Sequence, residues 1–543
     1  MPVPIAQLAA SSFDLVVIGA GINGAGIARD AAMRGLSVLL VDKTDLAAGT
    51  TSYSSRLIHG GLRYLEHAEI GLVRESLKER ERLLHFAPHL VKPLPLTLPI
   101  YKHHKRGRYL IRLGMIAYDI LSFDKSLPRH RMFDRQAALE HESGLNPHDL
   151  TGAARYYDAQ VEFPERLTLE NALSAVEYGA VVRTGTEVDD FRIEAGVVRG
   201  VSLVDTRTGE RAEASARCVV NVAGPWVDAV LANHGGPLAR KRLIGATKGS
   251  HIVVEPFPGA PKDALYIEAS QDGRPYFIIP WNHQYLIGTT DLRFTGDPDD
   301  VHPSEDEIRY LLTETNLAIP AAGLQREDVL YAYAGLRPLP YQEEGKEGAI
   351  TRRHIIHDHA PQFSGLLSII GGKLTTYREL AEITVNEVYR KLGLPASKSI
   401  TARVPLPGAS VPPQQQRETF MRKKPDWLSE ASANRLLQVY GSRANEIVAQ
   451  AIANPPLREM IHPASGTIAA SVVYAVTHEF ATTLHDVMFR RTMMGYASDF
   501  GQGGVEAVGR ILRTHCGWSD EQLARESREF RQFAEDSKAR IMP

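Results

Sequence analysis

A glycine-rich turn near the start of the chain has the spacing that a nucleotide-binding site requires. The motif G-x-G-x-x-G follows the apolar residues 13–18, with its glycines and one amide at Gly19, Gly21, Gly24 and Asn23. Bare glycines let the backbone approach a pyrophosphate, and the N-terminus of a following helix stabilises its charge. Asp42 ends the next apolar run, where a carboxylate can accept hydrogen bonds from ribose hydroxyls. The spacing predicts a dinucleotide site, and NAD fits it as well as FAD.

A hydroxyl-rich segment after Asp42 favours the longer of these two cofactors. Residues 46–55 are dense in Ala, Gly, Thr and Ser, where a nicotinamide-binding domain would continue with ordinary helix and strand alternation. The pyrophosphate and ribityl chain of FAD need donors along their length, although a solvated loop is the other interpretation. The candidate donors are Thr50, Ser52 and Ser55.

Other strand ends are expected to reach the same crevice. The apolar strand 218–222 halts at Gly224-Pro225, which is typical of a sheet edge that opens onto a cofactor. The buried strand 366–370 is followed by residues 371–376, which open a helix whose N-terminus can stabilise negative charge.

The elements that must position these residues form an α/β chain with a helical end. We predict a Rossmann-like FAD-binding domain with an antiparallel β-sheet substrate domain, plus an α-helical C-terminal domain. The oxidoreductase module spans residues 1–399. Its FAD-binding segments are about 13–95, 151–240 and 337–399, its substrate-side segments are about 96–150 and 241–336, and the helical domain is 400–543. Ser304 with Glu307 has the capping-box spacing of a helix start.

Bulk composition excludes several classes of protein. Lys+Arg 62 against Asp+Glu 64 gives a net charge of −2, so nothing global indicates nucleic-acid binding. The two cysteines, Cys218 and Cys516, cannot form a disulfide framework or a multi-cysteine metal site, which suits a reducing compartment. Residues 1–12 lack a signal-peptide pattern, and no window reaches the roughly 20 apolar residues of a membrane span. We expect a cytoplasmic location and no metal.

One basic cluster adjoins an apolar stretch. Residues 102–108 hold four Lys and Arg side chains with two histidines, and they run directly into the apolar residues 109–118. Such a pair can lie in the interface of an anionic membrane, and a surface loop that leads into a core helix is the competing interpretation.

Taken together, these segments resemble the FAD-dependent glycerol-3-phosphate dehydrogenases of the D-amino-acid-oxidase-like superfamily, over nearly the whole chain. Beyond the glycine turn, the resemblance rests on residues 55–66 (SRLIHGGLRYLE), 248–251 (KGSH), 288–291 (GTTD), 335–339 (GLRPL) and 371–378 (GGKLTTYR). It also covers the helical end, which looks like the cap domain of that family. The first motif alone is generic, but the set in this order is specific.

The resemblance implies an activity and its partners. The family oxidises sn-glycerol 3-phosphate to dihydroxyacetone phosphate with non-covalent FAD and delivers electrons to a membrane quinone. We therefore expect a peripheral enzyme on the cytoplasmic face of the inner membrane, in contact with its anionic surface. A homodimer is left open.

The resemblance also places the site residues. We expect Arg337 and Lys373 to anchor and polarise the substrate, with Arg63, Tyr64 and Arg352 completing the shell, because arginine and lysine suit a phosphate dianion. His251 is the preferred general base, since histidine titrates near working pH, and His59 is its competitor. The helix start near residue 371 is expected to stabilise the negative charge of reduced flavin. The cofactor-binding set is Gly19, Gly21, Asn23, Gly24, Asp42, Thr50, Ser52, Ser55, His59, Gly60, Gly224, Gly372, Lys373, Leu374 and Thr375.

Three other functions stay open. A glycerophosphate oxidase would return electrons to oxygen, although oxidases of this family tend to carry an insertion that is not obvious here. An amine or amino-acid oxidase of the same superfamily is disfavoured by the cationic residues and the C-terminal domain. A flavin-binding RNA-modifying or scaffold protein is disfavoured by the balanced charge.

Overall fold

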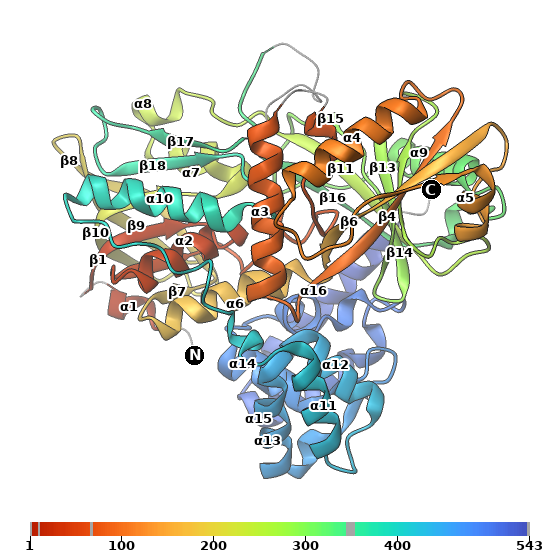
Figure 1. The fold of residues 1–543 in the computed structure, drawn as a ribbon. Helices are drawn as coiled ribbons and strands as arrows, with labels where there is room; N and C mark the ends of the chain where they lie inside the picture. Colours follow the sequence, from red (N-terminus) through yellow and green to blue (C-terminus); the bar gives the residue numbers. More distant parts are fainter. Residues whose placement is uncertain (1–2, 9–10, 66–68, 344–352, 540–543) are drawn as a thin grey trace.

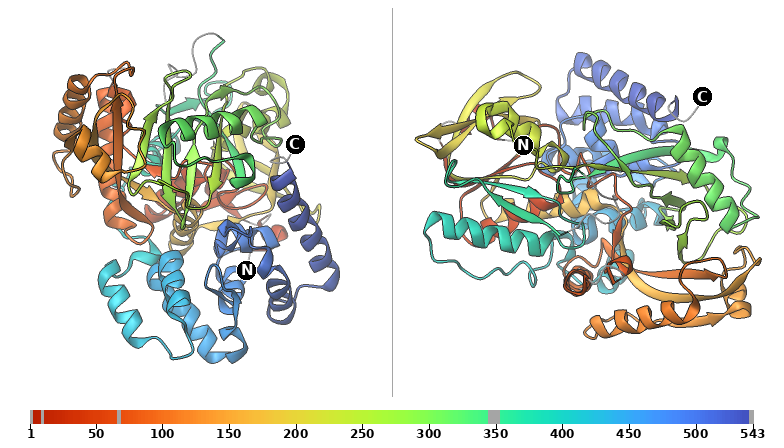
Figure 2. Two further views of the ribbon diagram at one scale, coloured as in Figure 1. Left: turned by 90° about the vertical axis from the view of Figure 1, so that its right-hand side faces the viewer. Right: turned by 90° about the horizontal axis from the view of Figure 1, so that it is seen from above.

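The computed structural model of the chain describes residues 3–8, 11–65, 69–343 and 353–539. In Figure 1 these residues form two β-sheets beside each other, and a helical unit built from the C-terminal residues packs below them. The views in Figure 2 confirm that the helical unit contacts one side of the two-sheet body.

The first sheet is mainly parallel and has the strand order β17-β18-β10-β1-β2-β7. Its parallel strands are β1 (Ser12–Ile18), β2 (Val38–Val41), β7 (Val181–Arg183), β10 (Arg211–Asn221) and β18 (Leu366–Ile370). β17 (Ile355–Asp358) pairs antiparallel at the edge, and β8 (Thr186–Glu194) and β9 (Val197–Asp205) extend β10 as an antiparallel ribbon. The carboxyl ends of β1, β2, β10 and β18 therefore meet at one edge, as the sequence predicts.

Both faces of this sheet are buried, which is usual for parallel strands. Leu15 and Val17 of β1 pack into one hydrophobic cluster with helix α2, whereas Val16 and Ile18 pack into another on the opposite face. The helices around this sheet are α1 (Ile5–Leu8), α2 (Ile22–Met33), α6 (Pro164–Glu177), α7 (Val227–His234), α8 (Gly236–Ala239) and α10 (Tyr377–Leu392).

The second sheet is largely antiparallel, as predicted for the substrate side. Its strands are β3 (Leu57–Ile58), β4 (Val91–Tyr101), β5 (Arg131–Asp134), β6 (Leu150–Val161), β11 (Thr247–Val254), β12 (Ala264–Glu268), β13 (Pro275–Trp281), β14 (Gln284–Gly288), β15 (Leu292–Arg293) and β16 (Val329–Arg337). Only the β4–β12 pair is parallel among these described strands. The accompanying helices are α3 (Ile70–Phe86), α4 (Arg108–Leu121), α5 (Arg135–His141) and α9 (Glu305–Ala318), and the predicted capping box of Ser304 and Glu307 begins α9.

The C-terminal unit is helical, as predicted, with two interruptions. It contains α11 (Pro413–Lys423), α12 (Glu430–Tyr440), α13 (Ala444–Ala453), α14 (Ala469–His478), α15 (Val505–Cys516), α16 (Asp520–Ala539) and the short pair β19 (Met460–His462) and β20 (Thr467–Ile468). Gly441 adopts a positive φ of 55° and separates α12 from α13. A π-helical turn, Asp486–Arg491, ends before Met493, whose φ of 58° breaks the helix.

Buried charges join the C-terminal unit to the start of the chain. Asp45 accepts hydrogen bonds from Arg490 Nε at 2.6 Å and from both terminal nitrogens of Arg491 at 2.8 and 2.7 Å. Arg490 also donates to Asp486 at 2.5 Å, four positions earlier in the chain. Because Asp45 follows the predicted ribose residue Asp42 by three positions, the helical unit holds the loop that leads away from the glycine turn.

We predict that Asp45→Ala weakens the attachment of the C-terminal unit and lowers the stability of the protein. Removing one partner of a buried pair leaves an uncompensated charge and costs about 3–5 kcal/mol, and here two buried arginines each lose one of their acceptors. Thermal unfolding with saturating FAD should show the loss, and limited proteolysis should release the C-terminal unit first. Asp520→Ala, which breaks the exposed pair with Arg513, serves as the control and should leave both measurements unchanged. Equal stability of Asp45→Ala and the parent would contradict the prediction.

Candidate active site

A cavity of about 830 Å³ lies at the carboxyl edge of the first sheet, within the size range of cofactor sites. Its lining includes the turns after β1, β2, β10 and β18, so four separate segments of the chain meet there as predicted. The predicted residues that line it are Gly19, Gly21, Asn23, Asp42, Thr50, Ser52, Gly224, Gly372, Lys373 and Leu374.

The glycines of the first turn have distinct roles. A Cβ atom at Gly24 would lie 1.8 Å from the Gly19 carbonyl oxygen, so this glycine lets α2 pack closely on β1 and does not line the cavity. Gly19 has a φ of 104° and lies against the Ala223 backbone, where a Cβ would come within 2.8 Å. Gly21 faces the cavity at the N-terminus of α2. These are the three roles that a pyrophosphate-binding turn requires.

The polar groups of this turn fit a diphosphate. Gly21 caps α2 without a side-chain hydrogen bond, so the first turn of the helix can offer N–H groups to an anion. Asn23 lines the cavity with a buried Oδ1 that has no hydrogen-bond partner among the described residues. Asp42 accepts hydrogen bonds from the N–H groups of Ala20 at 2.7 Å and Thr44 at 2.9 Å, and burial raises its pKa. The carboxylate is therefore fixed at the position expected for a ribose contact.

The hydroxyl-rich segment is folded onto the protein itself. Thr50 donates to the Leu336 carbonyl at 2.7 Å and Ser52 donates to the Ala47 carbonyl at 2.7 Å, so these hydroxyl hydrogens are already engaged. Thr51, which sequence reasoning missed, accepts the Ile22 N–H at 3.1 Å and so caps α2 from outside the helix. Ser55 does not line the cavity. Direct contacts of Thr50, Ser52 and Ser55 with a cofactor stay a prediction.

Ser55 instead pairs with the predicted base. Its Oγ lies 2.8 Å from His251 Nε2, and the His251 ring stacks on Tyr333 with centroids 4.9 Å apart. His251 Nδ1 is buried and has no hydrogen-bond partner among the described residues. Burial, with the charges of Arg337 and Arg56 adding to it, lowers the pKa of His251 to about 3. The imidazole is therefore neutral near pH 7, as a proton acceptor must be.

Arg337 ends β16, the strand that pairs with β11, and lies four positions along β16 from Tyr333, the residue paired with His251. It donates to Asp291 at 3.1 Å and to Thr289 at 3.2 Å, and a Cβ at Gly249 would lie 2.4 Å from its guanidinium. Only glycine at position 249 leaves room for this side chain. Thr289 and Asp291 belong to a motif of the resemblance, but nothing in the sequence assigned them to Arg337.

The start of α10 carries the remaining predicted residues. Lys373 lines the cavity, and Thr375 accepts the His59 N–H at 3.2 Å, which joins this turn to the segment that contains Gly60. Burial is the main cause that lowers the pKa of His59, and the charge of Lys373 contributes. His59, Gly60 and Thr375 do not line the cavity, so their cofactor contacts stay a prediction. α10 itself begins at Tyr377, and the expected effect on reduced flavin also stays a prediction.

Three predicted substrate residues cannot be placed. Arg63 and Tyr64 belong to the 3₁₀ helix Leu62–Leu65, of which the structure describes the backbone but not these two side chains. Arg352 lies outside the described residues.

A strap of the chain lines the cavity next to Lys43. We use this name for residues 297–303, of which 298, 299 and 301–303 line the cavity. Lys43 Nζ donates to both carboxylate oxygens of Asp299, at 2.8 Å each. Trp226 Nε1 donates to the same carboxylate at 2.9 Å. At the other end, Lys248 Nζ donates to the His302 carbonyl at 3.1 Å. Charge pairing of this kind is not visible in the sequence.

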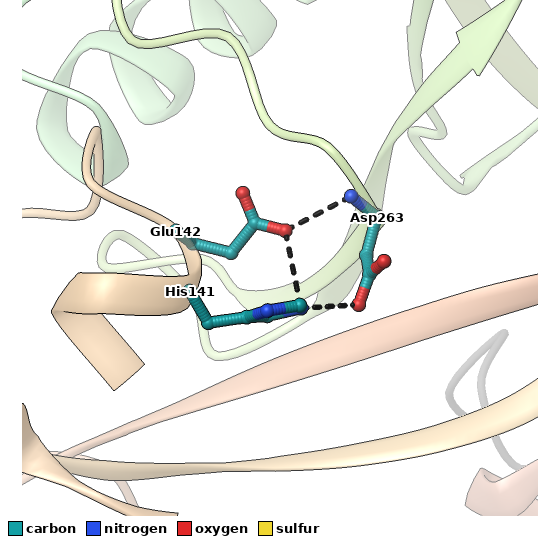
Figure 3. Close-up of side chains that lie close together, drawn as sticks. All are labelled: His141, Glu142 and Asp263. Atoms are coloured by element: carbon teal, nitrogen blue, oxygen red, sulfur yellow. Dashed lines mark hydrogen bonds and ion pairs between the residues drawn. The ribbon is translucent and has the colours of Figure 1, made fainter. Parts of the chain in front are cut away.

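A separate polar cluster has the donor types of a metal site but is already satisfied. Figure 3 shows His141, Glu142 and Asp263, whose ligand atoms lie within 4.8 Å of one another. Arg155 donates to Asp263 at 2.6 and 3.1 Å, and Glu142 accepts the N–H groups of Lys262 and Asp263. The guanidinium occupies the place where a cation would be needed, so this cluster joins α5 to β12 as an ion-pair network.

Comparisons with known proteins agree with this geometry. The profile of FAD dependent oxidoreductases matches residues 14–378, and the profile of the C-terminal domain of alpha-glycerophosphate oxidase matches residues 399–523. A glycerol-3-phosphate dehydrogenase from Synechocystis sp. is 48% identical over 97% of this chain and 97% of its own length.

The chain belongs to the FAD-dependent glycerol-3-phosphate dehydrogenase family. A D-erythritol 1-phosphate dehydrogenase from Brucella abortus is 39% identical over 88% of this chain and 94% of its own. The X-ray structure of a glycerol-3-phosphate dehydrogenase from Bacillus halodurans complexed with FAD has a TM-score of 0.78 at 29% identity, and covers 98% of this chain and 96% of that one. The predicted fold class, the enzyme class and FAD as the cofactor are confirmed.

We predict that Asp299→Ala speeds the release of FAD from the enzyme. The pair with Lys43 is partly exposed, so its loss is worth at most about 1 kcal/mol, or roughly a two- to fivefold faster dissociation. The recovery of flavin fluorescence after dilution measures the rate, and high salt should narrow the difference because it screens the pair. Asp306→Ala, another exposed acid of this region, is the control. An unchanged release rate would show that the strap does not slow the release of FAD.

Proposed function

We propose that the enzyme oxidises sn-glycerol 3-phosphate to dihydroxyacetone phosphate and passes the electrons to a membrane quinone. The observation that carries the proposal is that a neutral buried histidine, His251, and the cation Arg337 lie on paired strands, near enough for the charge of Arg337 to lower the histidine pKa. Neither side chain lines the cavity, but Tyr333, which stacks on His251, and Leu336, which precedes Arg337, do. The names of the relatives from Synechocystis and Bacillus halodurans support the same substrate.

The cations suit a phosphate-bearing substrate. Arg337 offers a planar fork for phosphate oxygens, and Lys373 lines the cavity with a compact charge. In this proposal they anchor the dianion, and Arg63, Tyr64 and Arg352 complete the shell. Asp291 orients Arg337 by a hydrogen bond of 3.1 Å.

His251 accepts the proton of the substrate hydroxyl in this proposal. Bound FAD would accept the hydride from the carbon that bears this hydroxyl, which completes the two-electron oxidation. Ser55 holds the ring of His251 by its Nε2 contact, and Tyr333 restrains it by stacking. A dianion bound at Arg337 would offset one of the charges that depress the pKa of His251, so the histidine becomes a better base when the substrate is present.

The surface of helix α4 favours a membrane-bound electron acceptor. Its buried face holds Ile111, Met115 and Tyr118, and another face exposes an apolar stripe at helical spacing. We call this the α4 stripe. Its members, with their exposed fractions, are Tyr109 (88%), Leu113 (63%), Ile116 (40%), Ile120 (65%) and Phe123 (78%).

Positive charge flanks the α4 stripe. Lys102, Arg108 and Arg112 are exposed beside it, although the whole chain has a net charge of −2. An exposed apolar stripe with adjacent cations suits the interface of an anionic bilayer. α4 forms part of the outer edge of the molecule in Figures 1 and 2. Among the described helices, none is long and apolar enough to cross a bilayer.

Two alternatives are separated by simple assays. Return of electrons to oxygen would produce peroxide, and oxygen uptake compared with quinone reduction by the pure enzyme decides between them. The 39% identity to a D-erythritol 1-phosphate dehydrogenase favours a longer polyol phosphate as a second candidate substrate. Anaerobic bleaching of the flavin by each phosphate, with glycerol as the control, identifies the substrate. Failure of glycerol 3-phosphate to bleach the flavin would overturn the proposal.

We predict that His251→Gln lowers the rate of anaerobic flavin reduction by roughly 10²- to 10³-fold, the contribution expected of a general base. A lowered histidine pKa means that the neutral form persists above about pH 3. His251 should therefore add no inflection to kcat/KM between pH 5 and 9, in contrast to an ordinary histidine with a pKa near 6.5. Stopped-flow reduction across this pH range provides the measurement. An unchanged rate with FAD still bound would exclude His251 as the base.

We predict that Arg337→Lys and Lys373→Ala each raise KM for glycerol 3-phosphate. A lost hydrogen bond to a charged group is worth about 1.5–3 kcal/mol, or roughly tenfold to 150-fold in KM. Lys78→Ala, at an exposed position of α3, is the matched control and should leave KM unchanged. Unchanged KM in both site variants would show that Arg337 and Lys373 do not bind the substrate phosphate.

We predict that the paired change Leu113→Asp and Ile120→Asp abolishes binding to vesicles that contain phosphatidylglycerol. Two charges would have to enter the apolar part of the interface, which opposes insertion of the α4 stripe. Flotation with vesicles measures binding, and vesicles of phosphatidylcholine alone should bind the parent enzyme less. Ile452→Asp, at a comparably exposed position of α13, is the control. Binding by the double variant equal to that of the parent would contradict the prediction.

A further inference from the structure

Glu307 on α9 is a buried carboxylate that joins several segments of the proposed site. Its Oε1 accepts hydrogen bonds from Ser250 Oγ at 2.8 Å and from Thr290 Oγ1 at 2.7 Å. Its Oε2 lies 2.7 Å from Lys248 Nζ and accepts the Ser304 N–H at 2.9 Å. Most of the lone-pair positions of the carboxylate are therefore used.

The two hydroxyl partners of Glu307 lie next to the two groups that the proposed chemistry requires. Ser250 directly precedes His251 on β11, and side chains alternate along a strand, so Ser250 faces α9 while His251 faces Ser55 and Tyr333. Thr290 lies between Thr289 and Asp291, the two residues whose side chains accept from Arg337. One carboxylate oxygen therefore accepts from the residue before His251 and from the residue between these two acceptors of Arg337.

A direct hydrogen bond also joins these two segments, and Glu307 adds a second connection between them. The Ser250 N–H donates to Thr290 Oγ1 at 2.9 Å, so the Thr290 hydroxyl accepts from β11 and donates its hydrogen to Glu307. These hydrogen bonds lower the pKa of the Glu307 carboxyl and outweigh the raising effect of its burial, so it stays ionised. An ionised acceptor makes stronger hydrogen bonds than a neutral one.

We propose that Glu307 is a positioning residue that sets the separation between His251 and Arg337. The proposal rests on the proposed function, because it assigns these two residues to proton removal and to phosphate binding. Glu307 does not line the cavity, and it acts through Ser250, Thr290 and Lys248. A displacement of about 1 Å of such groups costs on the order of 10²-fold in rate.

The chain offers a matched control on the same helix. Glu314 is also buried, and its two oxygens accept the N–H groups of Ser270 and Gln271, away from His251 and Arg337. Glu307→Ala and Glu314→Ala each delete a buried carboxylate of α9 that holds a loop. A purely structural role predicts the same consequences for both variants.

The test compares the holoenzymes at equal FAD occupancy. For Glu307→Ala we expect anaerobic reduction by glycerol 3-phosphate to fall at least tenfold in kcat, and KM and the Kd of inorganic phosphate to rise at least threefold. Perturbation of the flavin absorbance reports phosphate binding without turnover. Glu314→Ala should keep all three values within twofold of the parent, even if its melting temperature falls as far as that of Glu307→Ala.

Each outcome has a definite meaning. A rate, KM and phosphate Kd within twofold of the parent for Glu307→Ala would overturn the proposal, as would equal losses in both alanine variants. If Glu307→Ala does not fold, Ser250→Ala and Thr290→Val test the same links singly, and normal kinetics in both would overturn it. If the flavin of the parent is not bleached by glycerol 3-phosphate, the proposed function itself fails, and the role of Glu307 fails with it.

Discussion

The buried ion pair between Arg56 and Glu165 is the contact on which the other parts of the structure depend. Arg56 donates two hydrogen bonds to Glu165, at 3.0 and 3.1 Å, and both side chains are fully buried. Its guanidinium lies 4.4 Å from the Trp281 ring of the second sheet and 4.7 Å from the Tyr496 ring of the C-terminal unit. Because Tyr496 also donates to Glu165 at 2.7 Å, one charge pair brings together both sheets and the helical unit.

This pair also determines the position of the segment that faces the substrate side. Arg56 has a φ of 58°, a conformation that costs free energy in a residue other than glycine and persists only when the surroundings impose it. Its hydrogen bond to the Ser52 carbonyl, at 3.1 Å, shapes the chain between the cofactor loop and Ser55. Ser55 in turn holds His251, so the orientation of the proposed base depends on a cation buried at the meeting point of the three units.

The sequence predicted the local parts of this arrangement and missed the distant ones. Alternating apolar strands and the glycine turn near Gly19 identified the first sheet, because strand burial and the close approach of backbone depend on neighbouring residues. The pairing of Ser55 with His251 joins positions 196 residues apart, and no periodicity encodes it. The sequence pattern did not mark the interruptions of the C-terminal helices at Gly441 and Met493, where the backbone has a positive φ. The predicted roles of Arg63, Tyr64 and Arg352 rest on the family resemblance alone, since the structure does not describe these side chains.

The cofactor and the proposed chemistry draw on different halves of the fold. The first sheet supplies strand ends and a helix N-terminus, which suit any dinucleotide, whereas His251 and Arg337 come from β11 and β16 of the second sheet. Two positive charges, those of Arg337 and Arg56, act on a histidine that burial already keeps neutral. Each arginine already pairs with a carboxylate, Arg337 with Asp291 and Arg56 with Glu165, yet their charges still disfavour protonation of His251. In the proposed reaction a phosphate dianion bound at Arg337 acts against this effect and stabilises the proton that His251 accepts. The phosphate group would then both anchor the substrate and assist removal of its hydroxyl proton.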